Sequence, residues 1–188
     1  MSVEQAFEER TGEAFELDEP LTVIGSHLRP GQRAPDFALD AFDPTVQTLR
    51  TVRLVDAAGS VRLLNVVNSL DTPVCQVETR RWDELRGELP PDLRLYTVSM
   101  DLPFALARWQ TAERMEHELL SSHRSEQFGR DYGVLIKEWR LLQRAVFVVG
   151  RDGRLAHVEY VADQMREPDY ATAKEAILAL RDDQGSAK

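Results

Sequence analysis

Cys75 is the only cysteine of the chain and the residue best suited to redox chemistry. A largely apolar run over residues 63–67 precedes it and predicts a buried strand, and residues 77–89 carry apolar side chains at helical spacing. Thr72 is a good N-cap residue, and Pro73 suits a first helical position. We therefore expect Cys75 in the first turn of a helix, where free backbone N–H groups and the helix dipole favour a thiolate.

The residues around this cysteine leave two interpretations open. A lone cysteine is either an inert buried apolar residue or a nucleophile. Thr72 lies three residues before Cys75, so its hydroxyl can cap the helix, donate to the sulfur or a substrate oxygen, or do both. Arg144 begins a second apolar run, where its guanidinium either forms a surface ion pair or stabilises the thiolate and orients a small polar substrate. Glu78 would disfavour the thiolate if its carboxylate faced the sulfur.

No residue pattern supports a metal ion or an organic cofactor. The four histidines have no metal-ligand spacing with one another or with the cysteine: His27, His117, His123 and His157. The sequence has neither a glycine-rich phosphate loop nor a Gly-x-Ser-x-Gly elbow. We therefore expect no cofactor.

The composition argues against several classes of function. A net charge of −9 and an isoelectric point near 5.0 disfavour binding to nucleic acid or to an anionic membrane surface. No apolar run approaches the roughly 20 residues of a membrane span. The acidic N-terminal stretch lacks the apolar centre of a signal peptide, and one cysteine cannot form an internal disulfide. A cytoplasmic protein is the expectation.

The predicted elements alternate between strands and helices, which indicates an α/β protein with a central mixed sheet covered by helices. Hairpins are predicted over residues 14–24 and 144–161. Asp101, two residues before a proline, predicts a helix start with a capping carboxylate. The domain organisation that we expect has three parts: a poorly ordered segment over residues 1–13, a single domain over residues 14–181 and a polar tail over residues 182–188.

Eight short segments follow one another in a fixed order. They are Leu21-Thr-Val-Ile-Gly25, Pro30-Gly-Gln-Arg-Ala-Pro-Asp-Phe37, Ser69-Leu-Asp-Thr-Pro-Val-Cys75, Thr79-Arg80, Asp101-Leu-Pro-Phe-Ala105, Asp131-Tyr-Gly-Val-Leu-Ile136, Arg144-Ala-Val-Phe-Val148 and Glu167-Pro-Asp-Tyr170. Each segment alone is a weak signal, but the ordered set is specific. With these segments the chain resembles the peroxiredoxins, and specifically the bacterial thiol peroxidase subfamily.

This resemblance implies a thioredoxin-like fold with an N-terminal β-hairpin, a homodimer and no cofactor. Cys75 matches the peroxidatic cysteine, whose thiolate attacks the O–O bond of a peroxide and becomes a sulfenic acid. Thr72 and Arg144 match the residues that hold the peroxide and stabilise the charge on the leaving oxygen. The catalytic residues that the resemblance implies are thus Cys75, Thr72 and Arg144.

Two positions depart from the family pattern. Asn68 stands where the motif Pro-x-x-x-Thr-x-x-Cys begins with proline, which is expected to alter the shape of the cysteine pocket. Gln110 stands where the subfamily has its resolving cysteine, so the usual intramolecular disulfide cannot form. We therefore predict a one-cysteine cycle, in which a thioredoxin-like protein or a low-molecular-weight thiol reduces the Cys75 sulfenic acid.

The favoured function is a thiol-dependent peroxidase that acts on hydrogen peroxide or small organic hydroperoxides. The alternative is a relative that does not turn over: a peroxide sensor, or a dimeric interaction module that retains the fold. Asn68 and Gln110 favour the alternative, whereas Cys75, Thr72 and Arg144 favour the enzyme.

Overall fold

Two of the most apolar runs of the sequence form neighbouring central strands. The computed structural model describes residues 7–182. β5 (Arg62–Val66) and β10 (Ala145–Val149) are buried along their whole length and pair antiparallel, with Ala145 opposite Val66. Strands covered on both faces by other elements favour such nearly continuous apolar runs.

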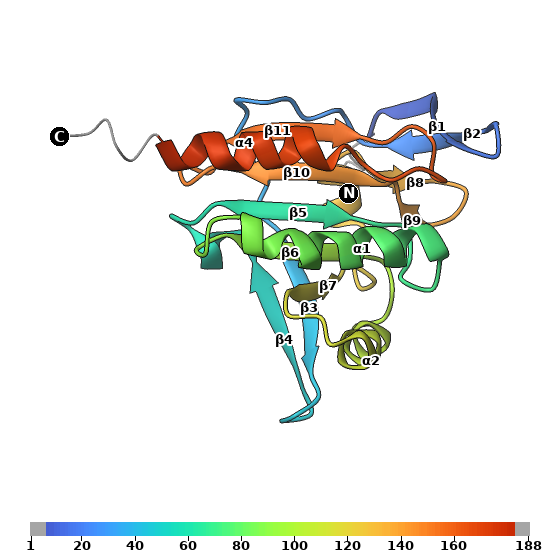
Figure 1. Cartoon of the computed structure of the whole chain (residues 1–188). Helices are drawn as coiled ribbons and strands as arrows, with labels where there is room; N and C mark the ends of the chain where they lie inside the picture. Colours follow the sequence, from blue (N-terminus) through green and yellow to red (C-terminus); the bar gives the residue numbers. More distant parts are fainter. Residues whose placement is uncertain (1–6, 183–188) are drawn as a thin grey trace, which may run out of the picture.

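The main sheet is mixed. Its other strands are β3 (Ala38–Asp43), β4 (Thr48–Arg53), β6 (Arg94–Ser99), β7 (Glu118–Ser121) and β11 (Leu155–Tyr160). The strand order is β11-β10-β5-β6-β7-β3-β4, in which the β5–β6 and β6–β7 pairs are parallel and the others antiparallel. The β3–β4 hairpin projects from the body of the molecule (Figure 1).

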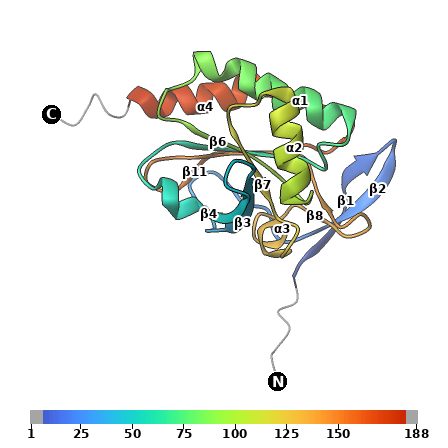
Figure 2. The same ribbon diagram turned by 90° about the horizontal axis from the view of Figure 1, so that it is seen from below.

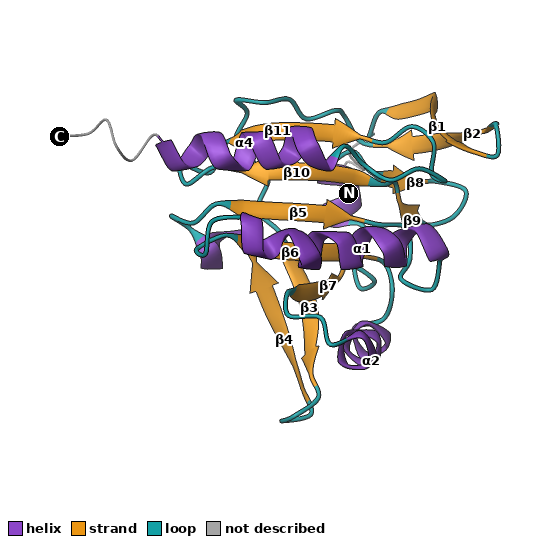
Figure 3. Cartoon of the chain, viewed as in Figure 1, coloured by secondary structure: helices purple, strands orange, loops and turns teal. Residues whose placement is uncertain are grey.

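Helices cover both faces of this sheet. They are α1 (Pro73–Leu85), α2 (Pro103–Glu113), α3 (Gln127–Asp131) and α4 (Tyr170–Asp182), with 3-10 turns at Leu54–Ala57 and Arg86–Glu88. α1 and α4 lie on one face (Figures 1 and 3). Between them the fully buried ring of Trp82 meets the ring of Tyr170 edge to face at 5.0 Å. α3 lies on the opposite side (Figure 2), where Phe128 stacks on Tyr132 at 4.4 Å above Phe147 of β10. The first of these layers fixes α1 against the sheet, because Trp82 and Leu85 pack with Val146 and Val148 of β10.

The N-terminal hairpin is longer than predicted. β1 (Glu9–Glu16) pairs with β2 (Glu19–Ile24), so the expectation of a poorly ordered segment is wrong for residues 9–13. Arg10 explains the difference, because its buried side chain donates to the Gly133 oxygen at 2.9 Å and anchors the strand. Residues 1–6 and 183–188 of the predicted end segments lie outside the described residues.

Two further features differ from expectation. β8 (Leu135–Ile136) and β9 (Leu141–Leu142) join the hairpin in a second sheet, and strands of two residues give no periodic signal. The N-cap of α2 is Leu102, so the predicted capping role of Asp101 is wrong. The predicted α/β fold, with its mixed sheet, flanking helices and N-terminal hairpin, is confirmed. No helix among residues 7–182 is long and apolar enough to cross a membrane.

Candidate active site

Cys75 is the third residue of α1, close to where the chain leaves the carboxyl end of β5. Pro73 is the first helical residue and Thr72 the N-cap, so the predicted first-turn position of Cys75 is confirmed. Cys75 is fully buried. The apolar residues packed around it are Val67, Leu70, Leu106, Leu119 and Trp109. The positive end of the helix dipole at this first-turn position favours negative charge on the sulfur.

Arg144 brings a positive charge to this buried sulfur. It directly precedes β10, the antiparallel neighbour of β5, and is only 1% exposed. Its Nη2 lies 3.4 Å from Cys75 Sγ and donates to the backbone oxygen of Gln164 at 3.0 Å, while Nη1 pairs with the carboxyl group of Glu78. The interpretation of Arg144 as a surface ion pair is therefore wrong. A guanidinium donor at this distance stabilises a thiolate.

Glu78 pairs with Arg144 through its Oε2 and does not hydrogen-bond the sulfur. It is fully buried, and its Oε1 has no hydrogen-bond partner among the described residues. Burial raises the pKa of Glu78 to about 8, although Arg144 acts in the opposite direction. Glu78 therefore keeps a proton more readily than an exposed glutamate does, which weakens its repulsion of a thiolate.

Thr72 lines the pocket beside the cysteine without contacting the sulfur through a hydrogen bond. Its hydroxyl donates to the Ser69 oxygen at 2.8 Å and makes no capping bond to the helix. The structure thus brings Cys75 and Arg144 into contact and places Thr72 on the wall of the same pocket.

Asn68 and Gln164 form a polar wall of the pocket, and local sequence patterns did not reveal Gln164. The Gln164 Oε1 accepts from the Arg144 backbone N–H at 2.9 Å and from Asn68 Nδ2 at 3.1 Å. Its Nε2 donates to the Val161 oxygen at 2.7 Å, which fixes the amide. Gln164 lies in the loop that follows β11, and only the three-dimensional fold brings it to Arg144, the residue directly before β10.

Asp101 holds the loop that carries the cysteine. Its Oδ1 accepts from the Ser69 hydroxyl at 2.7 Å, and its Oδ2 accepts from the Leu70 N–H and the Ser99 hydroxyl, both at 2.8 Å. A charged acceptor with three such donors restrains the backbone strongly. Asp101 therefore sets the path of the chain into α1.

The pocket at this site has a volume of about 280 Å³. Its lining residues are Glu16, Asn68, Thr72, Pro73, Val74, Trp139, Leu141, Arg144, Gln164 and Met165. Cys75 is fully buried and is not among them, but its sulfur lies 3.4 Å from Arg144 Nη2 and 4.0 Å from Asn68 Oδ1. Two of its polar lining residues, Asn68 and Arg144, contact Cys75, whereas Trp139, Leu141 and Met165 add apolar surface. This arrangement suits a small molecule with one polar end.

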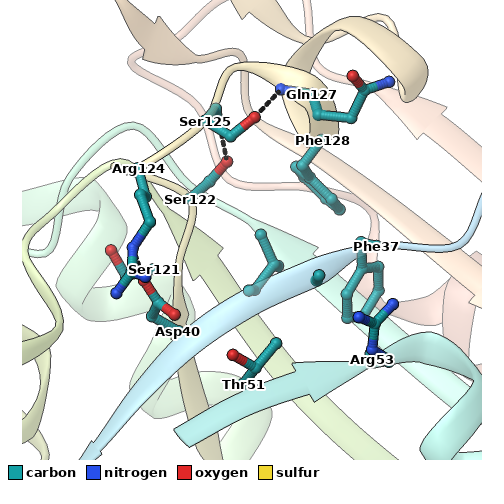
Figure 4. Close-up of a pocket in the computed structure, with 12 residues that line it drawn as sticks. Phe37, Asp40, Thr51, Arg53, Ser121, Ser122, Arg124, Ser125, Gln127 and Phe128 are labelled. Carbon is teal, nitrogen blue, oxygen red and sulfur yellow. Dashed lines mark hydrogen bonds and ion pairs between the residues drawn. The ribbon is translucent and has the colours of Figure 1, made fainter. Parts of the chain in front are cut away.

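A larger pocket, of about 430 Å³, lies between the β3–β4 hairpin and the segment from β7 to α3 (Figure 4). None of its lining residues lines the cysteine pocket. Arg124 pairs there with Asp40 at 2.9 Å, and the Ser125 hydroxyl accepts from the Gln127 N–H at 3.1 Å. Its polar groups thus largely satisfy one another.

Residues 7–182 contain no cluster of three or more His, Cys, Asp or Glu side chains able to hold a metal ion.

Gln110 has a structural contact in α2. Its Nε2 donates to the His117 backbone oxygen at 2.7 Å, and the His117 ring hydrogen-bonds Asp83 of α1 at 2.8 Å. The glutamine therefore links α2 to the segment before β7, and through it to the cysteine helix.

Comparison with known proteins agrees with this geometry. The AhpC/TSA family matches residues 30–158, which include Cys75 and Arg144. The chain belongs to the AhpC/TSA family. The thiol peroxidase of Bacillus subtilis (strain 168) is 41% identical over 162 residues, which cover 86% of this chain and 93% of that protein. The thiol peroxidase of Halalkalibacterium halodurans is 44% identical over 161 residues, covering 85% and 93%.

Solved structures share the fold of this AhpC/TSA family member. A peroxiredoxin-like protein from Aquifex aeolicus superposes with a TM-score of 0.77 at 29% identity, covering 93% of this chain and 98% of that one. The resemblance to peroxiredoxins that the sequence segments predict is confirmed.

Proposed function

We propose that this chain is a thiol-dependent peroxidase that reduces hydrogen peroxide or small organic hydroperoxides through Cys75. The observation that carries the proposal is the 3.4 Å contact between Arg144 Nη2 and Cys75 Sγ, beside a pocket large enough for such substrates. The similarity to proteins named thiol peroxidases supports the same reaction.

In the first step, the Cys75 thiolate attacks one peroxide oxygen and the O–O bond breaks. The sulfur is oxidised by two electrons to a sulfenic acid, and the other oxygen takes up a proton and leaves as water or an alcohol. Arg144 stabilises the thiolate and then the charge on the leaving oxygen. Thr72 helps to orient the peroxide once its hydroxyl turns from Ser69 towards the pocket.

In the second step, an external thiol, from a low-molecular-weight compound or a thioredoxin-like protein, attacks the sulfenic sulfur. Water leaves, a mixed disulfide forms, and a second thiol releases Cys75. Because Gln110 provides no second thiol, one equivalent of peroxide should give a monomer heavier by about 16 Da, or its thiol adduct, in intact-mass measurements. A covalent dimer would contradict the one-cysteine cycle.

Rapid mixing with peroxide, followed by tryptophan fluorescence, tests the catalytic claim. Arg144→Ala should slow the oxidation of Cys75 by at least about 100-fold, the loss expected for one aimed donor in a buried site. Arg81→Ala is the matched control, because Arg81 lies on the cysteine helix, pairs with Glu84 of the same helix at 3.2 Å and does not line the pocket. Oxidation of the unchanged chain no faster than that of a free thiolate would contradict the proposal.

A peroxide sensor that does not turn over is the second candidate, and the structural bond of Gln110 in place of a second thiol favours it. Steady peroxide consumption with an added thiol distinguishes the two: many turnovers per chain support the enzyme, and a single oxidation supports the sensor.

We also propose that the protein is a cytoplasmic homodimer. Support for the dimer comes from exposed apolar side chains on α2 and the β3–β4 hairpin, which meet at Phe104 and Phe42: Leu102 and Phe104 of the α2 start are 53% and 51% exposed, and Leu49 of β4 is 38% exposed. A reduced free cysteine, which the reaction requires, favours the cytoplasm.

A further inference from the structure

The amide of Asn68 is held in one orientation in the cysteine pocket. Asn68 is only 6% exposed, and its Nδ2 donates to the Leu142 oxygen at 2.6 Å and to Gln164 Oε1 at 3.1 Å. Two acceptors at this end of the amide require the nitrogen there. The oxygen Oδ1 must therefore face the other way, where it lies 3.4 Å from Arg144 Nη2 and 4.0 Å from Cys75 Sγ.

An acceptor oxygen at this position interacts differently with the protonated and the deprotonated forms of the cysteine side chain. Asn68 Oδ1 has no hydrogen to donate, so it gives no stabilisation to a thiolate or a sulfenate anion. It can accept a hydrogen bond from a sulfenic acid. The 4.0 Å separation leaves room for one oxygen bound to the sulfur, whose hydroxyl then lies within a normal O···O distance of about 2.7 Å.

We propose that Asn68 holds the Cys75 sulfenic acid in its protonated form and so favours its reduction over a second oxidation. This inference rests on the proposed peroxidase function. In the second oxidation, the sulfenate sulfur attacks another peroxide, the O–O bond breaks, the sulfur loses two more electrons to become a sulfinate, and the peroxide's proton stays with the other oxygen, which leaves as water or an alcohol. That step needs the deprotonated nucleophile. Reduction needs the protonated oxygen, which leaves as water when a thiol attacks the sulfur.

The need for such a device follows from Gln110. Without a second thiol in the chain, the sulfenic acid must persist until an external thiol reaches it. During that time further peroxide competes for the same sulfur. A hydrogen bond that retains the hydroxyl proton lowers the fraction of reactive anion.

The test compares Asn68→Leu, which keeps the size of the side chain and removes the acceptor, with the unchanged chain. Each is mixed with rising hydrogen peroxide without a reductant, and intact mass follows the species heavier by about 16 Da and about 32 Da. Loss of one hydrogen bond predicts a roughly tenfold faster second oxidation in the variant. The pH dependence of that step should also move about one unit lower, since the sulfenic acid then ionises more easily.

Asn65→Leu is the matched control. Asn65 is the other buried asparagine of this region, and its side chain bonds Thr97 at 3.1 Å, with no hydrogen bond to Cys75 or Arg144. Equal rates of second oxidation in the Asn68 variant and the unchanged chain would overturn the inference, and so would an equal rise in the Asn65 variant. If Asn68→Leu does not fold, Asn68→Ala gives the same comparison. The first oxidation is read from the same spectra, so a slow first step would count against the peroxidase function alone.

Discussion

Glu78 is the buried carboxyl group beside Arg144, and its proton makes folding depend on pH. Its pKa is 4.5 without the folded environment and about 8 within it, so the folded chain retains a proton that the unfolded chain releases between these values. The contribution of this proton to the free energy of unfolding is therefore complete below about pH 4.5 and is lost as the pH rises through about 8.

Glu78→Gln should remove this dependence, because the neutral amide keeps the shape of the side chain. The free energy of unfolding of the unchanged chain should fall, relative to that of the variant, by up to about 1.4 kcal/mol for each pH unit over this interval. Denaturant titrations at several pH values measure the difference. Glu84→Gln is the control, since Glu84 lies on the same helix with its side chain 65% exposed, and the same change in both variants would contradict the assignment.

Glu78 also affects the reaction. Above about pH 8 its carboxylate competes with the thiolate for Arg144. The rate of peroxide reaction of the unchanged chain should therefore decline above that pH, relative to that of Glu78→Gln. Rapid-mixing kinetics across the alkaline range measure this effect. Parallel pH–rate profiles of the unchanged chain and Glu78→Gln would contradict competition between Glu78 and the thiolate for Arg144.

At the scale of elements, the loop before α1 depends on Asp101. Asp101→Asn removes the charge, and one of the three donors at this side chain loses its acceptor. We expect about tenfold slower oxidation by peroxide and faster alkylation of Cys75 by iodoacetamide, because a loosened loop exposes the sulfur. Asp92→Asn is the control, since Asp92 only pairs with Arg151 at 2.6 Å on the surface. Unchanged alkylation would contradict this role.

The strand, turn and helix around Cys75 could be predicted from sequence because their signals lie within a short stretch: an apolar run, an N-cap and a proline. The partners of Asp101 could not, because Ser69 and Leu70 lie about thirty residues away and only the parallel β5–β6 pair brings them together. The contact of Gln164 with Arg144 could not be predicted for the same reason, because the two residues are 20 positions apart in the sequence. The position of Arg144 beside the sulfur came from family resemblance, since local pattern alone favoured a surface ion pair.

At the scale of the whole molecule, the proposed dimer makes a direct prediction. Phe104 is half exposed and packs edge to face on Phe42 at 5.0 Å, so a second copy that covers it would bury a substantial apolar area. Phe104→Glu should convert the dimer to a monomer in sedimentation velocity at micromolar concentration. Val55→Glu is the control, because Val55 is 57% exposed on a different part of the chain. A monomeric unchanged chain would contradict the proposal.

The antiparallel pairing of β5 and β10, with Ala145 opposite Val66, also limits how this protein can evolve or be redesigned. Cys75 follows the end of one strand and Arg144 precedes the start of the other, so the alignment of the two strands sets the sulfur–guanidinium distance. A one-residue insertion within β10 would shift the pairing by about 3.3 Å and reverse the faces of its side chains. Insertions at the tip of the projecting β3–β4 hairpin leave that alignment intact (Figure 1). Descendants of this chain can therefore vary the length of that tip without moving the sulfur from the guanidinium, whereas the chemistry fixes the register of β10.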